Sequence, residues 1–264
     1  MQVEEQRRNG ILEPFKERRQ HMNIAEENFN SRVASNPYPG RGIVMGLSES
    51  GQLLQLYWIM GRSDNSRNRI FENDDKGMLR TLPADPSKVQ DPSLVIYEAM
   101  LERDNHFIVS NGDQTRTIHQ MLKMESGGFE TASVAREREP DAPNYTPRIS
   151  GMITLDRGEA FFRYSILKAN PLNPSRSDRN FYYKDAVEPG LGFLITTYMG
   201  DGNPLPSFQG EPLPVPMKGT PDEILETYWN SLNEDNKISL ALKSIDPSNG
   251  SSEIRTLNRY SKTT

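Results

Sequence analysis

Three arginines follow the end of the most apolar stretch of the sequence. Residues 53–60 are nearly all large and apolar and predict a strand, and Arg62, Arg67 and Arg69 come shortly after it. Polar loops at strand ends commonly carry binding groups. A guanidinium keeps its charge and presents a planar set of donors, which suits a phosphate or a carboxylate. The segment therefore predicts an anion site, and the alternative is a solvated basic turn balanced by nearby carboxylates.

Further polar side chains stand within or beside other apolar segments. Tyr97 lies within residues 93–101, Asn111 follows a second apolar segment, and Glu139 and Asp141 lie in a charged loop. Such groups can position a substrate and exchange protons with it. A plain structural role is the alternative for each, because strands favour buried tyrosines and loop carboxylates are usually solvated.

The composition excludes several classes of function. The chain has 264 residues, enough for a full core, and its formal net charge of -5 argues against a dedicated nucleic-acid binder. No apolar run is long enough to span a bilayer and no cysteine is present, which fits the cytoplasm. His21, His106 and His119 are scattered, which disfavours a histidine metal cluster or a Ser-His-Asp triad. Acid–base chemistry is therefore expected mainly from Tyr, Lys, Arg, Asp or Glu.

Apolar segments in pairs, separated by short turns, predict antiparallel strands. The predicted strands are residues 42–46, 53–60, 93–101, 106–110, 149–155, 159–167, 191–198, 238–245 and 253–260. Residues 200–212 hold too many Gly and Pro residues for regular structure and predict a defined loop. Residues 172–178 are polar and predict a second loop.

Three helical segments are expected in the same region. Residues 114–124 place apolar side chains at helical spacing, and residues 127–134 predict a short second helix. Thr220 predicts the N-cap of a third helix, because Pro221 stands at its first position and Glu223 completes a capping box.

The order of these segments predicts an α+β fold. Strand pairs stand on both sides of a helical block and do not alternate singly with helices, so a doubly wound parallel sheet is not expected. Antiparallel sheets stacked face to face and covered by helices fit better. Residues 1–36 are charged and helix-leaning and predict an N-terminal extension to a main domain at residues 37–264. The extension is expected to pack on the main domain or on a partner subunit, with a partly ordered tail as the alternative.

Several blocks of the sequence together resemble the archaeal-type IMP cyclohydrolase family. They are residues 39–46, 57–69, 110–112, 144–149 and 197–212, and their order and spacing agree with the family. Agreement of several ordered blocks is more specific than any one of them. The similarity covers roughly residues 38–245, and the N-terminal extension lies outside it.

The resemblance implies a reaction and a fold. The family closes the second ring of a purine: a formylated aminoimidazole carboxamide ribonucleotide (FAICAR) loses water to give IMP. This ring closure needs no redox cofactor and no obligatory metal. The family fold resembles the αββα sandwich of N-terminal-nucleophile hydrolases. Because the chain does not begin with Ser, Thr or Cys, their autocatalytic nucleophile is not expected. A cytoplasmic homo-oligomer that binds a purine nucleotide is the expected form.

The resemblance also implies roles for individual residues. Tyr97 would donate a proton or a hydrogen bond to the developing oxyanion. The family arginine falls on Arg67 or Arg69, of which Arg69 is the one assigned to catalysis, and it would polarise a carbonyl or hold the nucleotide. Glu139 would be the base or orient the amide, with Asp141 as its rival. The implied substrate-binding residues are Arg41, Tyr57, Arg62, Arg67, Asn68, Asn111, Arg148 and Asp201. Residues 200–212 would wall the pocket, and no metal ligand is implied.

Two other functions remain open on the sequence alone. A different amide or nucleotide hydrolase could use the same scaffold, and a non-catalytic nucleotide-binding or regulatory protein could keep the arginines. The segment before Tyr97 and the spacing between Glu139 and Thr146 depart from the family pattern, which leaves room for both alternatives.

Overall fold

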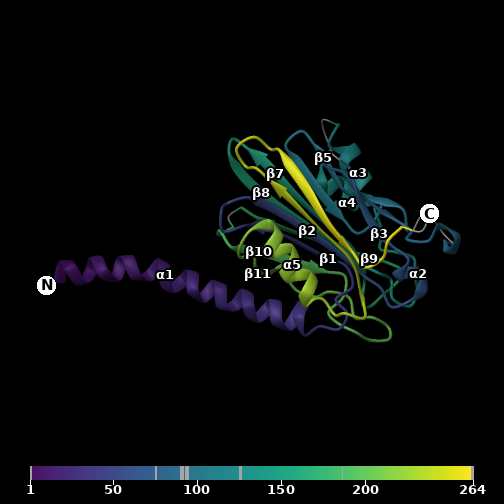
Figure 1. Cartoon of the computed structure of the whole chain (residues 1–264), viewed down its shortest axis with the longest axis horizontal. Helices are drawn as coiled ribbons and strands as arrows, with labels where there is room; N and C mark the ends of the chain where they lie inside the picture. Colours follow the sequence, from purple (N-terminus) through teal and green to yellow (C-terminus); the bar gives the residue numbers. More distant parts are fainter. Residues whose placement is uncertain are drawn as a thin grey trace.

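Two antiparallel sheets form the body of the protein (Figure 1). The computed structural model describes residues 2–74, 76–89, 92, 95–124, 127–185 and 187–262, with side chains from residue 16 onward. One sheet has six strands in the order β11-β10-β1-β2-β12-β13, and the other has seven in the order β3-β4-β5-β6-β7-β8-β9. The predicted α+β class with antiparallel sheets is confirmed. Ser93 and Leu94, at the start of one predicted strand, lie outside the described residues.

The bounds of the elements are as follows. The six-stranded sheet contains β1 (Gly42–Leu47), β2 (Leu53–Met60), β10 (Leu191–Thr196), β11 (Leu213–Pro216), β12 (Lys237–Ile245) and β13 (Ser252–Asn258). The seven-stranded sheet contains β3 (Ile70–Asn73), β4 (Leu79–Leu82), β5 (Tyr97–Arg103), β6 (His106–Ser110), β7 (Arg148–Asp156), β8 (Glu159–Ala169) and β9 (Ser177–Lys184). The helices are α1 (Gln2–Phe29), α2 (Asp64–Arg67), α3 (Gln114–Met121), α4 (Phe129–Val134) and α5 (Pro221–Ser231), with short turns η1 (Asn30–Ala34) and η2 (Pro86–Lys88).

Strand β2 shows how one apolar segment serves two cores. Tyr57 and Ile59 face the core between the two sheets, whereas Trp58 and Met60 face the core on the outer side of the six-stranded sheet. Successive residues of a strand point to opposite faces. A strand covered on both faces therefore needs a continuous apolar run, and this is the reason for the composition of β2.

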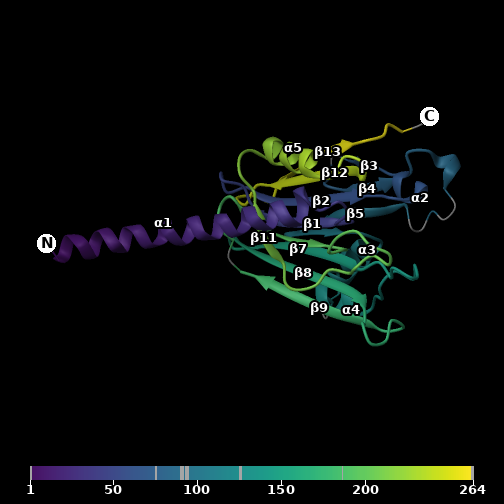
Figure 2. The same cartoon turned by 90° about the horizontal axis from the view of Figure 1, so that it is seen from below.

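Helices cover the outer faces of both sheets. Ile224 and Tyr228 of α5 belong to the outer core of the six-stranded sheet. Ile118 of α3 and Phe129 of α4 form a smaller core with Ile108 and Met152 of the seven-stranded sheet. In Figure 2, α5 lies on one side of the body, and β8, β9 and α4 lie on the other. The layers are therefore helix, sheet, sheet and helix.

Helix α1 begins far from the body and joins it only at its C-terminal part (Figure 1). There it lies along the edge strand β11: the Asn28 side-chain amide donates to the carbonyl of Pro214 (3.0 Å), and Phe29 packs edge-on against Tyr228. The helix thus covers a free sheet edge, which would otherwise invite pairing with another chain. No helix among the described residues combines the length and the apolar character needed to cross a membrane.

The sequence pattern does not reveal β3, β4, β9 or β11. Strand β9 starts at Ser177, so the predicted loop 172–178 is wrong at its last two residues. Most residues of β9 are half-buried, because it is an edge strand, and a clear two-residue alternation is missing. Strand β11 contains two prolines, which an edge strand tolerates because one side of it needs no ladder hydrogen bonds.

The predicted capping box of α5 is confirmed. The Thr220 hydroxyl accepts a hydrogen bond from the Glu223 N–H (3.3 Å), and the Glu223 carboxylate accepts one from the Thr220 N–H (2.8 Å). Replacing Thr220 by alanine should lower the free energy of unfolding by about 1 kcal/mol, measured by denaturant titration. Thr220→Ser keeps the acceptor and should stay close to the parent. An equal loss in both variants would contradict the capping explanation.

Candidate active site

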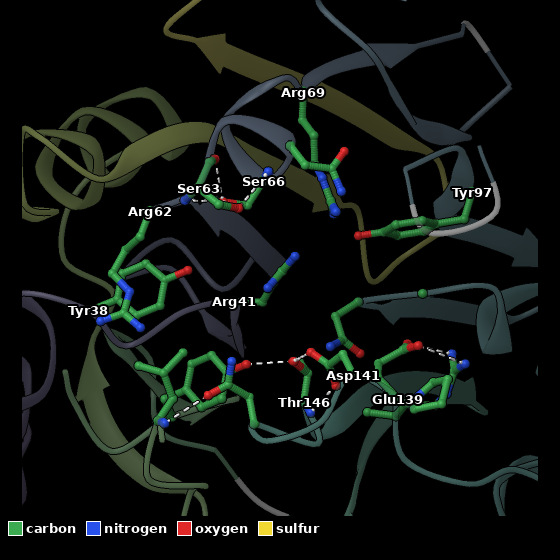
Figure 3. A pocket seen from close by; sticks show the side chains of 18 of the residues that line it. Tyr38, Arg41, Arg62, Ser63, Ser66, Arg69, Tyr97, Glu139, Asp141 and Thr146 are labelled. Carbon is green, nitrogen blue, oxygen red and sulfur yellow. Dashed lines mark hydrogen bonds and ion pairs between the residues drawn. The ribbon is translucent and has the colours of Figure 1, made fainter. Parts of the chain in front are cut away.

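A cavity of about 520 Å³ lies where strands of both sheets begin or end (Figure 3). Arg41 precedes β1, Arg69 precedes β3, Tyr97 begins β5, Arg148 begins β7, and Tyr198 follows β10. Antiparallel pairing places a strand start beside its neighbour's end, which brings these distant residues to one end of the sandwich. The volume is typical of a site for a small molecule.

The cavity collects most of the predicted site residues. It is lined by Arg41, Arg62, Arg69, Tyr97, Asn111, Glu139, Asp141 and Arg148. Four predicted residues are not among its lining residues: Tyr57, Arg67, Asn68 and Asp201. Their positions limit which of the predicted roles each of them can have.

Arg41 and Arg69 point into the centre of the cavity (Figure 3). Within the described part of the chain neither side chain has a carboxylate partner, and Nε of Arg69 is buried with no hydrogen bond. Burial, followed by the charge of Arg41, lowers the pKa of Arg69. Burial also opposes the charge of Arg41, but the tyrosines around it, led by Tyr38, hold its pKa above the ordinary value. Two cations held in this way create a positive field that suits an anionic ligand.

The Tyr97 hydroxyl faces the same space (Figure 3) and meets the hydroxyl of a second tyrosine, Tyr57. The hydroxyls of Tyr97 and Tyr57 lie 2.9 Å apart, and Tyr57 is fully buried between the sheets. Burial raises the pKa of Tyr57, so its hydroxyl stays protonated and can donate to Tyr97. Tyr57 therefore acts on the cavity through Tyr97 and does not reach it directly.

Arg62 lies at the rim of the cavity and connects two loops. Its guanidinium pairs with Asp201, donates to the carbonyl of Gly202 (3.3 Å) and stacks over the ring of Tyr38 (4.8 Å). Asp201 belongs to the loop that was predicted to wall the pocket, and Leu205 of the same loop lines the cavity. Asp201 therefore connects this loop to Arg62 through an ion pair that is partly exposed to solvent.

Glu139 lies across the cavity from Arg69 (Figure 3) and forms a buried ion pair with Arg148. Nη1 of Arg148 lies 3.0 Å from Oε1 of Glu139, and both side chains are about 85% buried, with 13% and 15% of their surface exposed. Burial raises the pKa of Glu139, although Arg148 and Arg41 act in the opposite direction. A carboxyl group whose pKa moves toward neutrality is suited to both accepting and releasing a proton.

Most N–H groups of the Arg148 guanidinium donate hydrogen bonds to other residues of the protein. Nη1 also donates to Asp113 (2.8 Å) and Gln114 (2.8 Å), and Nε donates to the carbonyl of Glu137 (2.8 Å). Arg148 was predicted to bind the substrate. Arg148 lines the cavity, and its contacts also orient Glu139 and connect it to the start of α3; substrate binding by Arg148 stays a prediction.

Asp141 differs from Glu139 in its contacts. Its carboxylate accepts hydrogen bonds from the N–H of Thr146 (2.7 Å) and from the Thr146 hydroxyl. These bonds fasten the loop between Glu139 and β7. Of the two rival carboxylates, Glu139 is therefore better placed for proton transfer, because its surroundings raise its pKa.

Three other predicted residues also bond to the protein itself. The Asn111 amide donates to the carbonyl of Pro147 (2.9 Å) and accepts from the N–H of Ile149 (2.9 Å). The Asn68 amide exchanges two hydrogen bonds with the backbone of Asp85. The Arg67 guanidinium donates to the carbonyl of Arg62 and to Asn236 at long distances, 3.4 and 3.5 Å. The single turn of α2 carries Arg67 away from the cavity, so direct substrate contacts by Arg67 and Asn68 find no support in their positions.

Sequence reasoning missed several residues that line the cavity. They are chiefly Tyr38, Ser63, Ser66, Thr146 and Tyr198. Thr146 and Tyr198 lie inside two of the family blocks, and this position was the signal that could have found them. Tyr38 stands in a turn before β1, and nothing local distinguishes it from a structural tyrosine.

Arg41 and Arg69 place positive charge in a cavity whose other wall carries a carboxyl with a raised pKa, and this arrangement suits a small anionic molecule. Comparison with known proteins agrees with the resemblance found in the sequence. The model of the family "IMP cyclohydrolase-like protein" matches residues 38–250, so the chain belongs to that family. It is 29% identical over 166 residues to the IMP cyclohydrolase of Methanopyrus kandleri, covering 61% of this chain and 75% of the relative. It is 24% identical over 165 residues to the IMP cyclohydrolase of Methanococcus aeolicus, covering 61% and 74%.

Proposed function

We propose that the protein is an IMP cyclohydrolase that converts FAICAR to IMP, a cyclohydrolase of the class that acts on cyclic-amidine C–N bonds. The observation that carries this proposal is the pair formed by the buried Arg69 and the half-buried Arg41, which face Glu139 across one cavity. FAICAR has a phosphate and two carbonyl oxygens that need cations or donors, and an amide that must lose a proton. The names and matched length of the two archaeal relatives support the same reaction.

The ring closure sets definite demands on the site. The carboxamide nitrogen forms a bond to the formyl carbon, and the C–O double bond becomes a C–O single bond. The carboxamide nitrogen and the formamide nitrogen each give up one proton. As the C–O bond breaks, the formamide nitrogen forms a double bond to the same carbon, and the oxygen leaves with both protons as water. An amide is a weak nucleophile, so most of the barrier must be lowered by positioning and by charge stabilisation.

In this proposal Arg41 and Arg69 bind the anionic oxygens of the substrate. Tyr97 donates a hydrogen bond to the formyl oxygen as negative charge develops there, and Tyr57 keeps the Tyr97 hydroxyl in place. Glu139 accepts the proton of the carboxamide nitrogen and returns it to the departing oxygen. A raised pKa suits both steps, because one group must act as base and then as acid.

Other residues act on the site without meeting the reacting atoms. Arg148 orients the Glu139 carboxylate, Asn111 fixes the backbone before β7, and Arg62 with Asp201 holds the loop at the rim. We further propose that the four layers have the arrangement of N-terminal-nucleophile hydrolases and that the enzyme works in the cytoplasm. The projecting helix α1 supports a homo-oligomer in which the N-terminal extension meets a partner subunit (Figure 1).

The direct test is to mix purified protein with FAICAR and to follow IMP formation by absorbance. Rapid formation of IMP, beyond the rate without protein, is expected. Absence of IMP would overturn the proposal, and binding of IMP should then be measured. Binding without turnover would favour a regulatory nucleotide-binding protein. Turnover of another amide or nucleotide in its place would favour a different hydrolase on this scaffold.

A further inference from the structure

Thr146 makes three hydrogen bonds with the loop that carries Glu139, through its N–H, its carbonyl and its hydroxyl. It is 6% exposed and stands just before β7. Its carbonyl accepts a hydrogen bond from the N–H of Glu139 (3.0 Å). Its own N–H donates to Asp141 Oδ1 (2.7 Å), and its hydroxyl donates to Asp141 Oδ2. One residue thus holds both ends of the turn from Glu139 to Asp141.

The Thr146 hydroxyl also meets Tyr198, with 2.6 Å between the two oxygens. A carboxylate can only accept, so the single hydroxyl proton of Thr146 goes to Asp141. The Tyr198 hydroxyl must then be the donor to Thr146. The donors and acceptors of these three side chains therefore fix the direction of the hydrogen bonds, which run from Tyr198 through Thr146 to Asp141. Each bond polarises the next.

Tyr198 is itself held firmly. It is 2% exposed, follows β10 of the six-stranded sheet, and stacks on the ring of Tyr38 at 6.0 Å and 20°. Thr146 lies two residues before β7, a strand of the other sheet. This series of hydrogen bonds therefore connects the ends of both sheets beside the cavity. Figure 3 shows the hydrogen bonds of the Thr146 hydroxyl along one wall of the cavity.

We infer that Thr146 is a positioning residue for Glu139, and that its hydroxyl performs this role by joining Asp141 to Tyr198. The inference rests on the proposed function of Glu139. Arg148 orients the carboxylate end of Glu139, whereas the Tyr198–Thr146–Asp141 chain fixes the backbone from which that side chain extends. Both supports are needed, because a displacement of about 1 Å in a reacting group can cost a hundredfold in rate.

The test compares two substitutions at one position. Thr146→Val keeps the shape of the side chain and removes the hydroxyl, and it should lower kcat for FAICAR roughly 10- to 100-fold. Thr146→Ser keeps the hydroxyl and should retain turnover within about threefold. The dissociation constant for IMP should change little in either variant, because Thr146 acts on Glu139 and not on the arginines that hold the ligand.

Tyr198→Phe gives a second measurement that does not touch Thr146. It should lower kcat less than Thr146→Val does, because the bond from Thr146 to Asp141 survives. Tyr228→Phe is the matched control: Tyr228 is also buried and its hydroxyl donates to one carbonyl, that of Pro216 (3.0 Å), but it lies in the core beneath α5. It should lose stability and keep kcat.

The outcomes separate this inference from the function on which it rests. Full kcat in Thr146→Val or in Tyr198→Phe, at a temperature where the variant is folded, would overturn the inference and leave the proposed function standing. The same holds if Thr146→Ser is as slow as Thr146→Val, or if only KM rises. A parent protein that forms no IMP would overturn the proposed function and this inference with it. If Thr146→Val does not fold, Tyr198→Phe alone decides.

Discussion

Replacing Glu139 by glutamine is expected to lower kcat for IMP formation by a factor of about 10² to 10⁴ while IMP still binds. Glutamine has nearly the same shape but cannot take a proton from the carboxamide nitrogen, and a positioned acid–base group usually contributes a factor of this size. The cations that would hold the ligand, Arg41 and Arg69, are unchanged in this variant. A tenfold loss corresponds to about 1.4 kcal/mol of transition-state stabilisation, so the expected loss is roughly 3–5 kcal/mol. Steady-state kinetics with FAICAR and calorimetry with IMP measure the two effects separately.

The neighbouring carboxylate Glu137 provides a matched control. It pairs with Arg179 (2.7 Å), is outside the lining of the cavity, and holds Arg148 only through its backbone carbonyl. Glu137→Gln should therefore keep kcat close to the parent value. Equal losses in the two variants would point to a general effect of charge, and full activity of Glu139→Gln would remove Glu139 from the mechanism.

The pH dependence of the reaction gives an independent check on Glu139. As the base it must be ionised, so the rate should fall as the pH is lowered through its pKa. Burial raises that pKa, and the fall should therefore begin at a higher pH than for an ordinary glutamate. In Glu139→Gln the residual rate should no longer show this fall at low pH. An unchanged fall in the variant would assign it to another group.

The parts of the fold that could be predicted from the sequence are those with strong local causes. The apolar run of β2 and the capping box at Thr220 each carry their explanation within a few residues. Strand β9 has no such signal, because its partner β8 supplies one side of its hydrogen bonding and solvent supplies the other. The sequence of its half-buried residues is equally typical of a loop.

The candidate site shows the same limit at the level of single side chains. Arg67 and Arg69 stand two residues apart, and nothing local indicates which one reaches the cavity. The single turn of α2 decides it, sending Arg67 toward Asn236 and leaving Arg69 buried beside Tyr97. The role of Arg148 likewise depends on Asp113 and Gln114, which only the pairing of β6 with β7 brings near it.

Replacing Arg69 by methionine is expected to abolish most activity and to stabilise the free protein. Arg69 is a buried residue, 5% exposed, and no carboxylate accompanies it among the described residues. A buried cation without a partner costs folding free energy, and Arg41 adds repulsion to that cost. Methionine fills a similar volume without charge, so the free energy of unfolding should rise by about 1–4 kcal/mol. Denaturant unfolding without ligand measures this gain.

The same substitution should also cause a large loss of activity. Removing one preorganised charged donor usually costs a factor of about 10² to 10³ in rate, and kcat/KM of Arg69→Met should fall at least this far. IMP should raise the melting temperature of the parent and not that of the variant, because binding stabilises only a protein that still recognises the ligand. Arg67→Met is the matched comparison and should keep both turnover and the thermal shift. If Arg67→Met is the more damaging substitution, the arginine that serves the substrate is Arg67, and the assignment made from the cavity is wrong. If Arg69→Met is active but less stable than the parent, the Arg69 guanidinium is a structural group whose cost is offset by contacts within the fold.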